Sequence, residues 1–196
     1  EGNTALFWAC WSDDPDMLHV IEYLLEHGAD VNCRNDDDTV PIHVAATRDD
    51  VALLHLLLRQ NDANLEMLDS SKSTPLMMAV KSERITKILL DRGANPNVRP
   101  DDNYPALVHA VRAGHTEAVR LLVQYGAEID PPDDFGIGDD MGRQPLHLAA
   151  LRGNRDIVSV LLASGVSATA KSKDGRNAVS WAAQGANIDI LNDLLR

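Results

Sequence analysis

Aromatic residues are scarce in this chain, making up 4% of its 196 residues. Its core must therefore rest on aliphatic side chains, and 44% of the residues are hydrophobic. Cysteine occurs only twice, which is too few for a disulfide framework. No apolar run approaches the roughly 18 residues that indicate a membrane span, so none is expected. These absences leave one ordinary domain or one repeat array.

Positive charge is also in short supply. Lys and Arg number 18 against 30 Asp and Glu, so the formal net charge is −12. A nucleic-acid groove needs a basic face to neutralise phosphates, and we therefore expect no nucleic-acid partner. There is also no basic segment followed by an apolar one, the pattern of a secretory leader. We predict a cytoplasmic protein, with the nucleus as the alternative.

One short segment recurs six times. Each copy has Pro or Ala second and an aliphatic residue third, and it continues into a small-residue pair such as Ala149-Ala150. Equivalent positions are 31 to 39 residues apart. Pro is tolerated in a first helical turn, and Thr74 or Asn177 can cap the helix that follows. The copies begin at Thr4, Val40, Thr74, Pro105, Gln144 and Asn177.

A second motif recurs late in each copy, as in Leu89-Leu90-Asp91-Arg92-Gly93-Ala94. Its glycines, Gly28, Gly93, Gly126 and Gly165, stand where a helix ends in a left-handed residue. With the repeat period of about 33 residues, the two motifs resemble the ankyrin repeat family across essentially the whole chain.

The resemblance implies an all-α ankyrin-repeat solenoid of helix–turn–helix units with β-turn or hairpin fingers. It also places His43 and His147 at the family's structural histidine, whose ring ties one repeat to the next. The predicted organisation is a single array over 1–196, with repeats at about 1–35, 36–69, 70–100, 101–130, 142–173 and 174–196 and an inserted finger loop at 131–141.

No catalytic, cofactor or metal motif emerges. Gly136-x-Gly138-x-x-x-Gly142 has the wrong spacing for a dinucleotide fingerprint and follows acidic residues that would repel a pyrophosphate. The seven histidines show no ligand spacing, and two cysteines cannot complete a usual structural zinc set. We therefore predict no enzyme activity, no cofactor and no metal. The acidic finger tips also disfavour nucleotide or small-molecule binding.

Candidate partner-binding residues follow from the family, which typically binds through finger tips and the concave row of first helices. After the small-residue pairs, four consecutive repeats carry a cation, which either neutralises nearby acidic fingers or forms a two-signed groove that orients a charged segment. Aromatic residues would anchor a partner there. Residues 142–196 carry net charge +3, against −15 for residues 1–141. The candidate set is Trp11, Arg48, Lys81, Tyr104, Arg112, Phe135, Arg143, Arg152 and Arg176.

The predicted function is a non-catalytic protein-interaction module or scaffold that binds a protein or peptide segment. The alternative is a regulatory or targeting ankyrin segment of a larger multidomain enzyme or innate-immune-type signalling protein. Phe135, in the inserted loop, is either a partner contact or part of a tolerated surface insertion. Phe7, Trp8 and Trp11 crowd one short helix, so we expect further repeats or a domain before residue 1, or a partner that covers these rings.

Overall fold

The computed structural model describes residues 4–14, 16–100, 104–129 and 142–195. The chain divides into two compact units, unit 1 from Glu1 to Asn103 and unit 2 from Tyr104 to Arg196. Within the described residues the regular elements are helices and there is no strand, which confirms the all-α prediction. The predicted finger loop 131–141, and Phe135 with it, lies outside the described residues.

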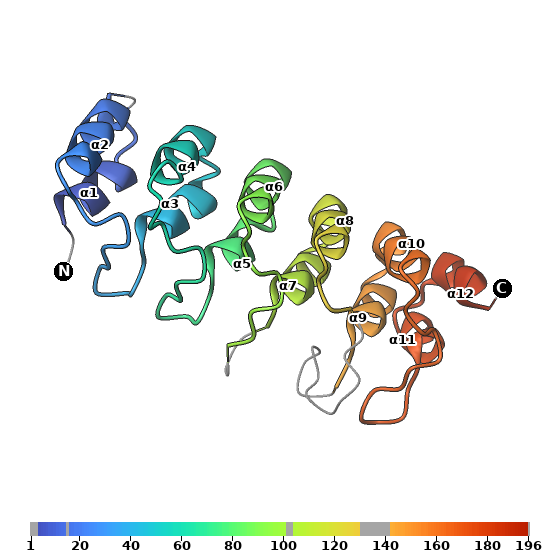
Figure 1. Ribbon diagram of the computed structural model, residues 1–196. Coiled ribbons are helices and arrows are strands. Elements are labelled where there is room, and N and C mark those ends of the chain that lie inside the picture. Colours follow the sequence, from blue (N-terminus) through green and yellow to red (C-terminus); the bar gives the residue numbers. More distant parts are fainter. Residues whose placement is uncertain (1–3, 15, 101–103, 130–141, 196) are drawn as a thin grey trace. The chain divides into compact units, whose positions relative to one another are not determined.

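Unit 1 contains three helix hairpins. The first helices α1, α3 and α5 pack side by side, and the second helices α2, α4 and α6 form a parallel row (Figure 1). The loops that join one hairpin to the next project to one side. The helices are α1 Ala5–Trp11, α2 Met17–Glu26, α3 Pro41–Arg48, α4 Val51–Leu57, α5 Pro75–Ala79 and α6 Glu83–Asp91.

Unit 2 repeats this arrangement. Its first helices α7, α9 and α11 pack in one row, and its second helices α8, α10 and α12 in another. One hairpin falls in each predicted repeat range, while the exact repeat boundaries stay a prediction. The helices are α7 Ala106–Ala113, α8 Thr116–Gln124, α9 Pro145–Arg152, α10 Arg155–Ala163, α11 Ala178–Gln184 and α12 Ile188–Leu194.

Side-chain caps begin several helices. The Thr74 hydroxyl accepts a hydrogen bond from the Met77 N–H at 3.3 Å, and the Asn177 side chain accepts one from Ser180 at 3.1 Å, which confirms both predicted caps. Pro41, Pro75 and Pro145 each begin a first helix, where the missing N–H has no helical partner to lose.

Two buried histidines join neighbouring repeats, as predicted. The Val40 N–H donates to His43 Nδ1 at 3.2 Å, and His43 Nε2–H donates to the Ser73 carbonyl of the next finger at 3.0 Å. His147 is bound in the same way between the Gln144 N–H and the Ala170 carbonyl. Each ring therefore needs Nδ1 unprotonated, which is the neutral imidazole form.

Glycines end the helix hairpins, and small aliphatic side chains pack between them. Gly28, Gly93, Gly126 and Gly165 have φ between 84° and 87°, the left-handed conformation predicted for these helix ends. The core between helices is mainly Leu, Ile, Val and Ala. The Ala pairs of α3 and α9 are completely buried, and their small side chains let adjacent first helices approach closely.

Acidification should destabilise unit 1 through His43. Burial lowers the pKa of His43, so its folded pKa lies below the unfolded value near 6.5. The free energy of unfolding is then highest above pH 6.5 and falls as pH drops from there towards the folded pKa, by at most about 1.4 kcal/mol per pH unit.

Urea unfolding of the wild type and of His43→Gln at pH 7.5 and 5.5 measures this effect. Gln cannot protonate, so we expect a smaller loss of stability between the two pH values in the variant. An equal loss in both proteins would contradict the assignment.

Candidate partner-binding surfaces

Arg48, at the end of α3, is engaged within unit 1. Its guanidinium donates to the Trp11 carbonyl at 2.9 Å and to the Ser12 carbonyl at 3.4 Å, and it forms an ion pair with Asp13. Its side chain is 25% exposed. Arg48 thus holds the segment that joins α1 to α2, a structural role that the sequence did not reveal.

Trp11 and Lys81 are the other sequence-predicted candidates in unit 1. Trp11 ends α1, is half exposed, and its ring stacks on Phe7 with centroids 6.4 Å apart. The Phe7 ring is buried and therefore fixes the indole in place. Lys81 follows α5 and is exposed. A preorganised exposed indole is a suitable anchor for a partner.

Tyr104 and Arg112 form a pair at the start of unit 2. The Arg112 Cζ lies 5.0 Å from the centroid of the Tyr104 ring, a cation–π distance. Tyr104 also meets the edge of the His109 ring at a centroid distance of 6.3 Å. Arg112, near the end of α7, is exposed. A guanidinium that stacks by its face keeps an N–H edge for a carboxylate.

A second aromatic centre gathers Arg143 and Arg176 around Trp181 on α11. The Cζ atoms of both arginines lie 5.0 Å from the Trp181 ring. The indole is 1% exposed, and its Nε1–H donates to the Ser172 hydroxyl at 3.1 Å. We call Arg143, Ser172, Arg176 and Trp181 the Trp181 cluster. It places two positive charges against one buried ring.

The fingertip beside this cluster positions Arg176 further. Arg176 donates to the Gln184 side chain at 2.6 Å, and its Nε lies 3.3 Å from an Asp174 carboxylate oxygen. The Ser172 hydroxyl donates to Asp174 at 2.6 Å, and this hydrogen bond lowers the pKa of Asp174. Asp174 therefore stays ionised well below neutral pH and offsets part of the Arg176 charge.

Arg152, at the end of α9, is exposed, and the described residues offer it no hydrogen bond or ion pair. It holds the same repeat position as Arg48, two residues beyond the small-residue pair. The difference lies in the preceding loop. Five residues separate α1 from α2, and among them the Ser12 carbonyl and the Asp13 carboxylate reach Arg48, whereas only Gly114 and His115 separate α7 from α8.

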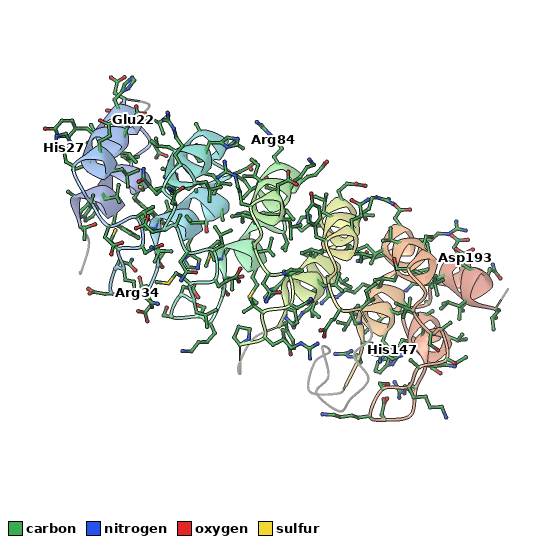
Figure 2. The ribbon with its side chains drawn as sticks, viewed as in Figure 1. Glu22, His27, Arg34, Arg84, His147 and Asp193 are labelled. Atoms are coloured by element: carbon green, nitrogen blue, oxygen red, sulfur yellow. The ribbon has the colours of Figure 1, made fainter. Side chains whose placement is uncertain are left out.

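Hollows also lie on the surface of unit 1. A groove of about 390 Å³ lies between α2 and α4, beside the 2.7 Å ion pair of Glu22 with Arg59. Glu22 is labelled on α2 in Figure 2. A cavity of about 230 Å³ lies beside Arg48 and Cys10. Burial raises the pKa of the Cys10 thiol to about 12, so it is protonated at neutral pH and is not a nucleophile there.

The described residues contain no group of three His, Cys, Asp or Glu side chains arranged to hold a metal ion. Nor does any helix in the described ranges combine the length and apolarity that a bilayer span requires.

Rows of helix hairpins with fingers on one side define a helical repeat protein. Two family models match the chain: "Ankyrin repeats (3 copies)" over residues 42–133, and "Ankyrin repeats (many copies)" over 17–58 and 107–162. The chain belongs to the ankyrin repeat family. Ankyrin repeats generally mediate protein–protein interaction, and the matching models describe repeats and no catalytic domain.

The chain is similar to a transient receptor potential cation channel subfamily A member 1 homolog of Caenorhabditis elegans, with 29% identity over 180 residues. It is 29% identical to human Rabankyrin-5 over 182 residues and 30% identical over 197 positions to the ankyrin repeat and KH domain-containing protein mask-1 of C. elegans. These alignments cover 91%, 91% and 99% of the chain but only 14%, 15% and 7% of those proteins.

Among solved structures, the ankyrin repeat domain of Bcl-3 is similar, with a TM-score of 0.77 and 26% sequence identity. The match covers 89% of this chain and 77% of that one.

The two equivalent arginines should respond differently to substitution. Arg48→Met keeps most of the side-chain volume but removes the hydrogen bonds to the α1–α2 segment, and we expect a loss of about 1–2 kcal/mol in the free energy of unfolding. Arg152→Met removes no such bond and should change it by less than about 0.5 kcal/mol. Urea denaturation of both variants measures the difference. Equal losses would contradict the structural role of Arg48.

Proposed function

We propose that this chain is a non-catalytic protein-interaction module whose second unit binds an acidic segment of a partner protein. The single observation that carries the proposal is the pair of exposed arginines at the ends of the neighbouring helices α7 and α9. Arg112 contacts the Tyr104 ring, and Arg152 has no partner among the described residues. Both therefore have guanidinium edges to offer a carboxylate.

The Trp181 cluster adds positive charge to the same unit. Arg143 and Tyr104 each directly precede a capping position, as Arg176 does, so these three side chains recur with the repeat. We call Arg112, Arg143, Arg152 and Arg176 the unit 2 basic surface. Aromatic rings orient three of its members, which reduces the entropy that a partner has to remove on binding.

Charge along the sequence supports the same partner chemistry. Residues 142–196, which include Arg143, Arg152 and Arg176, carry net charge +3 and attract an acidic segment, whereas residues 1–141, which include Arg112, carry net charge −15. Charges of this kind raise association rates and specificity more than affinity.

A second candidate function is that of a regulatory or targeting segment within a larger multidomain enzyme or signalling protein. The relatives favour this second function, because the chain spans only between 7% and 15% of their length in the three alignments above. The cytoplasm remains our proposed compartment, with the nucleus as the alternative. Both cysteines are free thiols, which is usual in reducing compartments.

The unit 2 basic surface should bind a fluorescein-labelled oligoglutamate peptide. Each of Arg112→Gln and Arg152→Gln should raise the Kd about two- to fivefold, the equivalent of about 0.5–1 kcal/mol for an exposed charge pair. The Kd should also rise with ionic strength. Fluorescence anisotropy measures both effects.

Arg120→Gln is the matched control, because Arg120 lies on the second helix α8 and pairs with Glu117 at 3.3 Å. It should leave the Kd unchanged. If all three variants bind equally, the assignment of this surface fails. If a labelled DNA oligonucleotide binds more tightly than the peptide, the expectation of a protein partner fails.

Trp11 should act as an anchor for the partner protein. Trp11→Ala should weaken the affinity of a partner isolated with the intact chain by about 2 kcal/mol, roughly thirtyfold in Kd. Calorimetry measures this Kd, with Tyr125→Ala as the exposed-aromatic control on the α8 side. An unchanged Kd for Trp11→Ala would exclude Trp11 from the interface.

A further inference from the structure

The two exposed tryptophans of α1 occupy different repeat positions. Trp11 aligns with Thr47, Lys81, Arg112, Leu151 and Gln184; Leu151 is half-buried and the other four are exposed. Trp8 aligns with Val44, Met78, His109, Leu148 and Trp181. Val44, Leu148 and Trp181 are at most 4% exposed, and Met78 and His109 are half-buried, yet Trp8 is 56% exposed. Exposure is therefore ordinary for Trp11 and exceptional for Trp8.

In two of the later repeats, the residue at the position of Trp8 contacts the preceding repeat. Trp181 lies under Arg143, which belongs to the repeat before it. The Met78 sulfur accepts a hydrogen bond from the Thr47 hydroxyl at 3.3 Å, and Thr47 again belongs to the repeat before. By the same register, the Trp8 ring projects towards the side of α1 that would meet a preceding repeat.

The second helix shows the same exception. Val20 and Leu24 of α2 align with pairs that are at most 2% exposed in the following four repeats: Leu53 and Leu57, Ile85 and Leu89, Ala118 and Leu122, and Ile157 and Leu161. Val20 is 43% exposed and Leu24 is half-exposed, whereas their neighbours Ile21 and Leu25 stay buried. The exposed stripe is thus the one turned away from α3 and α4.

The last repeat confirms which stripe faces which way. In α12, Ile190 aligns with Val20 and is 1% exposed, because α10 covers it, while the following Leu191 is half-exposed. The first repeat has the opposite pattern, with Val20 exposed and Ile21 buried. Figure 2 shows His27, which stacks on the exposed Tyr23 at 4.0 Å, on the side of α2 away from α4.

We infer that Trp8, Val20 and Leu24 form a repeat–repeat interface, and that an ankyrin-type helix hairpin preceding residue 1 in the same polypeptide covers it. We call these three residues the stacking face. Its positions match those of the interfaces already formed inside both units, so the occupant that fits them is another hairpin of the same type. The inference is independent of the partner that unit 2 binds. It assigns different surroundings to the two tryptophans, because Trp8 would pack against the preceding hairpin while Trp11 stays exposed.

A graft tests this fit. Residues 143–176 contain α9 and α10, the hairpin that buries Trp181, and Asn177 holds the same repeat position as Thr4. Joining 143–176 directly to Thr4 therefore places α9 and α10 against the stacking face in register. In a Trp11→Phe background, which leaves Trp8 and the buried Trp181, we expect a blue-shifted emission and a several-fold lower acrylamide quenching of Trp8.

The matched control is the same graft in a Trp8→Phe background, where Trp11 should stay as accessible to acrylamide as it is without the graft. Val20→Glu, a charge on the stacking face, should abolish the protection of Trp8 while circular dichroism shows the helices intact. Trp8 that remains equally quenched after grafting would overturn the inference.

A second experiment tests the inference in the natural polypeptide. Oxidation by N-bromosuccinimide, followed by mass spectrometry, should modify Trp8 much more slowly in that polypeptide than in residues 1–196 alone, while Trp11 reacts equally in both. Equal reactivity of Trp8 would overturn the inference. So would protection of Trp8 in residues 1–196 that grows with protein concentration, because the occupant would then be a second copy.

Discussion

The structure depends on contact between neighbouring repeats. A hairpin such as α3–α4 has only fifteen helical residues and cannot enclose a core alone, so its apolar stripe is buried by the hairpins beside it. Polar groups reinforce this stacking. His43 and His147 reach the next finger, and Asn187 donates to the Ala150 carbonyl at 2.7 Å. Each of these bonds satisfies a backbone group that the hairpin cannot satisfy itself.

This dependence decides which side chains are available for binding. An arginine beside a loop with accessible carbonyls forms hydrogen bonds to the neighbouring repeat, as Arg48 does. An arginine beside the short turn at Gly114 has no such acceptor and stays at the surface, as Arg152 does. Aromatic rings act in the same two ways, since Trp181 is a buried support for two guanidiniums while Trp11 remains half exposed. The side chains available to bind a partner are therefore those that the contacts between repeats do not use.

Residue type and spacing were sufficient to predict the helical repeats, the capping roles of Thr74 and Asn177, and the left-handed glycines. Each of these depends on neighbours within a few positions along the chain. The bridging histidines were placed by the family resemblance, whereas their carbonyl partners in the adjacent finger lie at different offsets, 30 residues beyond His43 and 23 beyond His147. The scarcity of aromatic residues had the same local explanation, since Ala and Leu fill thin helical layers.

The binding surface was less predictable. The sequence by itself determined that cations recur after the small-residue pairs, and the family resemblance placed them on the concave side. Only the tertiary structure decided that Arg48 is bound to the Trp11 carbonyl, that Arg143 and Arg176 share the Trp181 ring, and that Trp8 and Trp11 face different surroundings. The physical reason is that a helix or turn follows from local propensity, whereas the partner of a long side chain depends on loop lengths and packing in another repeat.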